Sequence, residues 1–257
     1  MKKFIIFLTT ILLFTCLLPS CSKEEEIRLL ESITYNDGSG TYEEKYEYDN
    51  QNRITKISYY DTSGEFSIEN TLIYNGNDLV GDDNNDDGYE KISYENYEKD
   101  FDVTLEEHEK NGNIIKVKYR PMYFHLNSDG NLIRIDVHND EGNPLTPINY
   151  IYDQNGNLIT YSLDNDIYLH EYEYDNKKAP FTHCNTPKWW MQYKELPTKN
   201  NIIKMTEDGK VGNEYNEYVY EYDDAEYPIK CTTKYSNGSK AETVYKYIFP
   251  NDKTRNE

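Results

Sequence analysis

The sequence is poor in cysteine, with 4 in 257 residues. Cys16 and Cys21 lie within or just after an N-terminal apolar segment, so only Cys184 and Cys231 remain for the folded part of the chain. Two cysteines do not make the disulfide framework on which small secreted domains depend. Cys184 and Cys231 could form a single disulfide or stay as free thiols, and their separation in sequence does not decide between the two.

The chain also lacks a long apolar run that could cross a membrane. The longest apolar run covers residues 4–18, which is too short, because a membrane-spanning helix needs about 20 residues. Lysines precede the run, and it ends at Leu18-Pro19-Ser20-Cys21. This arrangement is typical of a bacterial lipoprotein signal, in which the cysteine becomes the lipid-modified first residue of the mature chain. We therefore predict a cleaved signal peptide at residues 1–20 and lipid attachment at Cys21.

Basic residues are scarce, with 27 lysines and arginines against 47 acidic residues and a net charge of −20. Such an excess of negative charge repels the phosphates of nucleic acids and favours solubility. Nucleic acid is therefore excluded as a partner. The expected partners are the outer membrane, through the lipid, and a glycan, a peptide or a membrane protein.

Motifs that carry catalysis are missing as well. The sequence has no Gly-x-Ser-x-Gly, no His-Glu-x-x-His, no phosphate-binding glycine loop and no Cys-x-x-Cys. A glycan hydrolase would need only two carboxylates, and it remains an alternative, but 47 acidic residues offer too many pairs to single one out. We expect a protein that is not an enzyme and that has no cofactor.

Tyrosine, by contrast, is abundant, with 27 copies, and much of it lies in an internal repeat. Residues 46–57 (YEYDNQNRITKI) recur at 124–135 and 150–161, and shorter copies begin near residues 74, 111, 200 and 220. In each copy aromatic and charged residues alternate, Asp, Asn and Gly follow, and the alternation then resumes. This pattern predicts antiparallel hairpins with the tyrosine rings on one face.

Seven such hairpins give roughly 14 strands, more than an open twisted sheet usually holds without curling. We predict an all-β fold, a single large antiparallel meander of repeated hairpins curled into an open or closed barrel-like sheet. This domain would cover residues 31–249, between a lipidated acidic tether at 21–30 and a C-terminal tail at 250–257. Tyrosine rings would supply much of its core.

The unit Tyr-x-Tyr-Asp-x-x-Gly-x-Leu resembles the YD repeat of Rhs-type surface and toxin-shell proteins. Segments 172–181, 199–202 and 220–228 resemble a family of Bacteroidetes lipoproteins of unknown function with a porin-like β fold. Ser22-Lys23-Glu24-Glu25-Glu26 is similar to the export tag of surface lipoproteins in such bacteria. These resemblances imply an outer-membrane lipoprotein that faces the cell surface, and they are silent on activity.

The loop at residues 81–88 is a candidate metal site. Asp83, Asn85 and Asp87 have the spacing of the first half of a calcium-binding loop. The position that should carry the bidentate glutamate is Tyr94, and a glutamate follows one residue late at Glu95. A solvated hairpin tip is therefore the favoured interpretation, and a weak Ca²⁺ site is the alternative.

Residues 179–200 interrupt the repeat and contain 3 of the 9 prolines and both tryptophans. Trp189, Trp190 and Tyr193 could form a flat platform that binds a sugar ring or a peptide. The alternative is a plug that caps the sheet and buries the tryptophans, which we favour because lone aromatic clusters more often pack than bind.

The sequence thus predicts an outer-membrane, surface-exposed lipoprotein that acts as a non-catalytic binding or structural module for a glycan, a peptide or a partner protein. A glycan hydrolase and a purely architectural YD-repeat shell are the alternatives.

Overall fold

The computed structural model describes residues 26–84, 89–95, 100–108, 114–139, 141–163, 169–209 and 212–250. Nearly all of them lie in strands or the turns between strands, which confirms the all-β fold class. The strands are β1 (Leu29–Asn36), β2 (Thr41–Tyr48), β3 (Ile54–Tyr60), β4 (Phe66–Asn75), β5 (Asp78–Asn84), β6 (Tyr89–Glu95), β7 (Asp100–His108), β8 (Ile114–Leu126), β9 (Leu132–Val137), β10 (Ile148–Tyr152), β11 (Leu158–Leu163), β12 (Leu169–Tyr174), β13 (Ile202–Gly209), β14 (Gly212–Tyr222), β15 (Pro228–Tyr235) and β16 (Lys240–Ile248).

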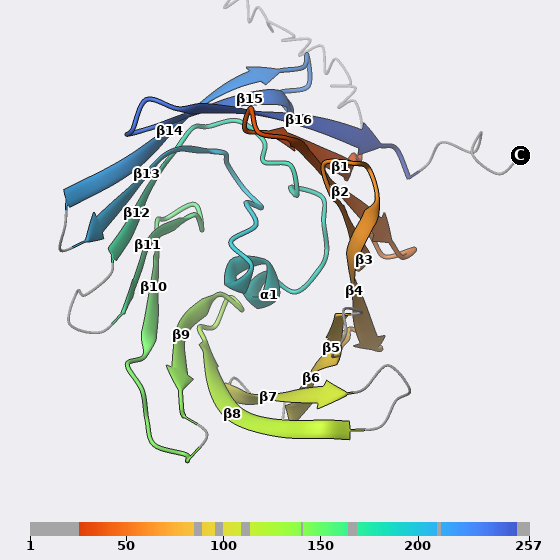
Figure 1. The fold of residues 1–257 in the computed structure, drawn as a ribbon, viewed down its shortest axis with the longest axis vertical. Helices are drawn as coiled ribbons and strands as arrows, with labels where there is room; N and C mark the ends of the chain where they lie inside the picture. Colours follow the sequence, from red (N-terminus) through yellow and green to blue (C-terminus); the bar gives the residue numbers. More distant parts are fainter. Residues whose placement is uncertain are drawn as a thin grey trace, which may run out of the picture.

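These 16 strands form one sheet in the described part of the chain, close to the number expected from the repeats. Consecutive strands from β1 to β5 and from β6 to β16 pair antiparallel, and β1 also pairs with β16, so that Leu29 lies opposite Ile248. The sheet order therefore ends at β5 and β6, and no ladder joins those two strands within the described residues. The sheet curls around a central space but does not close (Figure 1).

One helix, α1 (Lys188–Tyr193), lies in that central space (Figure 1). It is 6 residues long. Among the described residues, no helix has the length and apolar character needed to cross a membrane.

The predicted alternation of the tyrosine strands is confirmed. Tyr46, Tyr150 and Tyr172 are 4%, 5% and 6% exposed, whereas the neighbouring Glu47 and Glu173 are exposed. Tyr46 and Tyr150 face the inside of the curled sheet and pack with aliphatic side chains of other strands in one core. The period of two along each strand thus separates an aromatic inner face from a charged outer face.

Six turns share one hydrogen-bonding pattern, in which the side chain of the first residue holds the turn. In the turn at residues 127–131, the Asn127 N–H donates to the Asn131 carbonyl at 2.9 Å. The Asn127 side-chain oxygen accepts the N–H groups of Asp129 and Asn131 at 2.9 and 3.0 Å. The first residue is Asp or Asn in all six turns, which cover residues 49–53, 61–65, 127–131, 139–143, 153–157 and 223–227.

The fourth residue of each turn has a positive φ, between 63° and 89°. Glycine occupies it in four of the six turns, as at Gly156, because a residue without Cβ adopts that conformation without strain. Asn52 and Glu226 hold the same position at φ 63° and 69°. The turn pattern therefore tolerates side chains there when the first residue supplies its acceptor.

Tyrosine hydroxyl groups join each repeat to the one before it. Tyr152 donates to the Leu132 carbonyl at 2.6 Å, and Tyr174 donates to the Leu158 carbonyl at 2.7 Å. Each acceptor is a residue at the start of the preceding strand. The same bond recurs from Tyr48 to Leu30, Tyr74 to Ile54, Tyr220 to Ile202 and Tyr247 to Pro228.

These bonds predict how substitutions at the turns behave. Asn127→Ala removes an acceptor that serves two backbone N–H groups, so we expect the free energy of unfolding to fall by about 1 to 2 kcal/mol. Asn127→Asp keeps the acceptor, as Asp153 does in the equivalent turn, and should change it by less than about 0.5 kcal/mol. Urea unfolding monitored by tryptophan fluorescence measures both values. Equal losses in the two variants would contradict the role of the acceptor.

Candidate functional site

The segment that breaks the repeat is an insertion into one of these turns. The Asp175 N–H donates to the Asn201 carbonyl at 3.0 Å, and the Asp175 carboxylate accepts the N–H groups of Lys177 and Asn201, both at 3.0 Å. Asp175 and Asn201 thus stand where the first and last residues of a turn stand elsewhere. Residues 176–200, which we call the insertion, replace the usual three central residues.

The insertion runs into the central space of the sheet and carries α1 (Figure 1). Trp190 and Met191 are 0% exposed and Trp189 is 8% exposed. Trp189 and Tyr193 both pack edge-on against Phe124 of β8, with ring centroids 5.6 and 5.4 Å apart. The two tryptophans are therefore part of the core, as the plug interpretation predicted, and they do not form an exposed platform.

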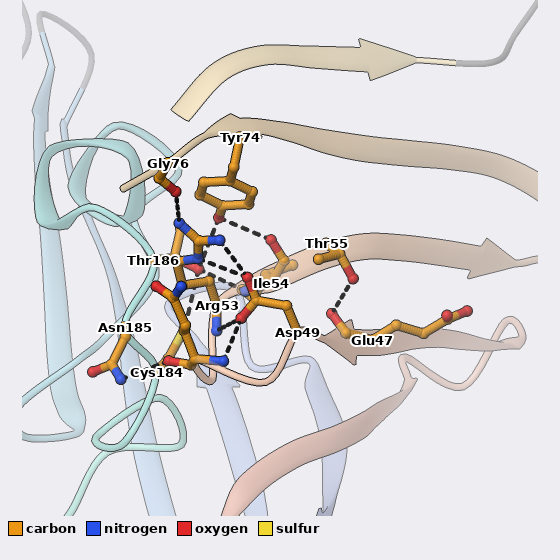
Figure 2. Close-up of polar contacts among 11 residues, drawn as sticks. Glu47, Asp49, Arg53, Ile54, Thr55, Tyr74, Gly76, Cys184, Asn185 and Thr186 are labelled. Carbon is orange, nitrogen blue, oxygen red and sulfur yellow. Dashed lines mark hydrogen bonds and ion pairs between the residues drawn. The ribbon is translucent and has the colours of Figure 1, made fainter. Parts of the chain in front are cut away.

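Polar contacts attach the insertion to the turn at residues 49–53 (Figure 2). The Ile54 N–H donates to the Thr186 hydroxyl at 2.8 Å, and the Asn185 N–H donates to the Asn52 carbonyl at 2.9 Å. In the same turn Arg53 forms an ion pair with Asp49 at 2.6 Å. The insertion therefore supplies an acceptor to a buried N–H at the start of β3.

An equivalent contact holds the insertion to the turn at residues 127–131. The Leu132 N–H donates to the Gln192 side-chain oxygen at 2.8 Å, and the Gln192 amide donates to Asn131 at 3.0 Å. Leu132 begins β9 as Ile54 begins β3. The corresponding residue of β15 is Pro228, which has no N–H to satisfy.

A third contact joins the insertion to both ends of the described chain. The His183 ring accepts the Arg28 N–H at 3.0 Å and lies 3.1 Å from the Tyr227 hydroxyl. The Arg28 guanidinium forms an ion pair with Asp223 and lies 5.2 Å from the ring centroids of both Tyr227 and Phe249. Cation–π contact and charge thus fix the entry of the chain beside its last strand.

Asp82 is a buried charge that sequence reasoning placed in the acidic loop. It lies instead in β5 opposite Leu72 and is 4% exposed. Its partner is Lys194 of the insertion, at 3.3 Å, and no described residue donates a hydrogen bond to either carboxylate oxygen. Simple alternation from the buried Leu79 would turn Asp82 outward, but the register shifts between Ile73 and Tyr74, so that Asp82 lies opposite the buried Leu72. Its partner is distant in sequence.

The inner face of the sheet carries a group of tyrosines beside the insertion, which we call the inner tyrosine face: Tyr150, Tyr161 and Tyr172. Tyr150 and Tyr161 are opposite each other on β10 and β11, with ring centroids 5.4 Å apart. Tyr172 donates to the Glu195 carboxylate of the insertion at 3.2 Å. Burial, together with the charge of Glu195, raises the pKa of all three phenols. They stay neutral hydrogen-bonding groups at physiological pH.

A cleft lies at the rim of the sheet between the insertion and two turns, and we call it the rim cleft. Its volume is about 580 Å³. Lys188, Gln192, Thr198 and Lys199 of the insertion form one side, and residues of the turns at 127–131 and 153–157 form the other. Sequence reasoning missed it because the two walls are brought together only by the fold.

Cys184 and Cys231 are both free, so the possible disulfide is not formed. Cys184 lies in the insertion, 3.3 Å from the Thr186 hydroxyl, and Cys231 lies in β15 opposite Tyr220. Burial raises the pKa of the Cys184 thiol and raises that of Cys231 to about 11. Both thiols are protonated at neutral pH and therefore weak nucleophiles.

The remaining predicted site residues cannot be placed. Cys21, Asn85 and Asp87 lie outside the described residues, and so does the side chain of Asp83. Lipid attachment and the weak Ca²⁺ site stay predictions. In the part of the chain that the structure describes, no group of three or more His, Cys, Asp and Glu side chains could hold a metal ion.

Comparison with known proteins agrees with this architecture. The family model of the Teneurin YD-shell matches residues 20–189. The chain belongs to this family. Membership in this family agrees with the repeated hairpins and their Asp- or Asn-led turns. A search of curated proteins finds no match to the chain.

The chain is also similar to two solved structures. A porin-like protein from Bacteroides uniformis is 15% identical and has a TM-score of 0.56, over 84% of this chain and 96% of that one. A porin-like protein from Bacteroides vulgatus is 11% identical and has a TM-score of 0.45, over 86% of this chain and 99% of that one. At such low identity the Bacteroides uniformis structure supports the porin-like β fold alone.

The packing of the insertion predicts its effect on stability. Trp190→Ala should lower the free energy of unfolding by about 3 to 5 kcal/mol, because it leaves a cavity in the core. Tyr215→Ala is the matched control, because Tyr215 is an aromatic residue on β14 that is 42% exposed. It should cost less than about 0.5 kcal/mol. Calorimetric melting of the two variants tests this, and equal melting temperatures would contradict a buried plug.

Proposed function

We propose that this β-structural module is an outer-membrane lipoprotein, displayed at the cell surface, that acts as a non-catalytic binding or structural module for a glycan, a peptide or a partner protein. The observation that carries the proposal is the inner tyrosine face, which the insertion positions and which a ligand could contact. Tyrosine offers a large contact area and a hydroxyl group at a small cost in side-chain entropy.

The exposure of the tyrosines favours binding as well as packing. Tyr150 and Tyr172 are buried and rigid, whereas Tyr161 is half-buried and the neighbouring Glu195 is exposed. Tyr161 also packs edge-on against His170, with ring centroids 5.5 Å apart. A rigid aromatic surface with one exposed carboxylate suits a ligand that has both apolar faces and hydroxyl or amide groups.

The outer face of the sheet supports attachment by a lipid anchor. Oppositely charged side chains pair across neighbouring strands, as Lys56 with Glu47 at 2.6 Å and Lys230 with Glu242 at 2.7 Å. Such a face is stable in water. The lipid that we predict at Cys21 would hold the domain to the membrane, through the tether predicted at residues 21–30.

The anchor is tested by one substitution. Cys21→Ser should abolish lipid modification and leave the signal peptide uncleaved by the lipoprotein pathway, because lipidation requires a thiol. Mass spectrometry of the protein and partition into detergent measure both effects. Cys16→Ser, inside the predicted signal, is the matched control and should leave the lipid in place. Lipidated Cys21→Ser protein, or an unlipidated wild type, would contradict the anchor.

Binding by the inner tyrosine face is tested with glycan and peptide arrays. The mature protein should retain a ligand without converting it, and Tyr161→Ala should weaken retention by about 10-fold, which is about 1.4 kcal/mol. Tyr215→Ala, on the outer face, should leave it unchanged. Conversion of the ligand would contradict the non-catalytic role. Absence of binding on both arrays would leave the structural role alone.

A further inference from the structure

The insertion is positively charged in an acidic chain. Residues 176–200 contain five lysines and one glutamate, whereas the whole chain carries a net charge of −20. Because charges in physiological salt are screened over about 8 Å, the local balance at the insertion decides which ligand can approach it. We therefore ask where each of these lysines lies.

Three of the five lysines already contact residues of the sheet or of its turns. Lys177 forms an ion pair with Glu226, and Lys194 forms one with Asp82 at 3.3 Å. The Lys178 ammonium lies 5.0 Å from the ring centroid of Tyr227. These three contacts hold the insertion to the sheet, and carboxylates compensate the charges of Lys177 and Lys194.

The other two lysines, Lys188 and Lys199, line the rim cleft and are exposed. Within the described ranges, no carboxylate lies at ion-pair distance from either of them. Two ammonium groups on one wall give that wall a positive charge that can pair with anionic groups of a ligand, and the carboxylates of the lining, Asp129 and Asp153, lie on the opposite wall. The charges of these two lysines are therefore available to such a ligand.

The opposite wall supplies amide groups and two carboxylates. Gln154 and Asn155 are exposed at the tip of the turn at residues 153–157. Asp153 offers little further capacity, because its carboxylate already accepts the N–H groups of Asn155 and Asn157 at 2.8 Å and the Asn157 amide at 3.0 Å. Asp129 is an exposed carboxylate that can accept hydroxyl groups. This wall suits a ligand that has many hydroxyl groups.

We infer that the rim cleft is a binding site for an acidic oligosaccharide, whose carboxylates pair with Lys188 and Lys199 and whose hydroxyl groups bond Gln154, Asn155 and Asp129. The cleft volume, about 580 Å³, falls within the usual range for ligand sites. A single small anion would leave most of it empty. The inference rests on the proposed binding role and adds a site that shares Tyr150 with the inner tyrosine face but includes neither Tyr161 nor Tyr172.

The test is calorimetric titration of the mature protein with trigalacturonate and with galactotriose, its uncharged counterpart. Trigalacturonate should bind, and its affinity should fall with salt because the contact is ionic. Lys188→Gln with Lys199→Gln should weaken it by about 10-fold or more. Both lysines are exposed, so the melting temperature should not change. Lys204→Gln with Lys230→Gln removes the same charge from the outer face and is the matched control, which should bind as the wild type does.

Four results would overturn the inference: no heat with millimolar trigalacturonate, equal affinity for galactotriose, equal affinity for triglutamate, or unchanged affinity in the variant at positions 188 and 199. Triglutamate carries the same net charge without the hydroxyl groups, so equal binding would identify an acidic peptide site. If trigalacturonate does not bind the rim cleft, array binding that depends on Tyr161 would still support the proposed function. The two proposals can therefore fail separately.

Discussion

The fold depends on one local interaction, the acceptance of two backbone N–H groups by the side-chain oxygen of an Asp or Asn at the start of a turn. This bond reverses the chain after each tyrosine strand, as at Asn127 and Asp153. The tyrosine hydroxyl then bonds a carbonyl at the start of the preceding strand, as from Tyr152 to Leu132. Turn and hydroxyl together tie each strand to the one before it, and the inner aromatic face follows from the alternation along each strand.

The same interaction explains how the sheet accommodates its insertion. Asp175 and Asn201 keep the bonds of a turn although 25 residues separate them. The strands β12 and β13 therefore pair as if the insertion were absent. The entropic cost of closing a loop grows only slowly with its length. The sheet can therefore carry a long segment at this point, and that segment fills the centre of the sheet.

Once inside, the insertion satisfies groups that the sheet leaves open. Thr186 and Gln192 accept the N–H groups of Ile54 and Leu132, and His183 accepts that of Arg28. A buried N–H without a partner would cost about 1 to 3 kcal/mol. The shell and the insertion therefore depend on each other, and the tryptophans that sequence reasoning could assign to a ligand or to a plug are required for packing.

The sequence by itself determined the class of the fold, because the period of two, the Asp- and Asn-led turns and the tyrosine repeat act over a few residues. It located the break in the repeat and favoured the burial of Trp190. Only the tertiary structure decided that Cys184 and Cys231 stay apart, that Asp82 pairs with Lys194, and that the two sides of the rim cleft meet. Those contacts join residues far apart in the chain, and their partners depend on the curvature of the whole sheet, which no local pattern encodes.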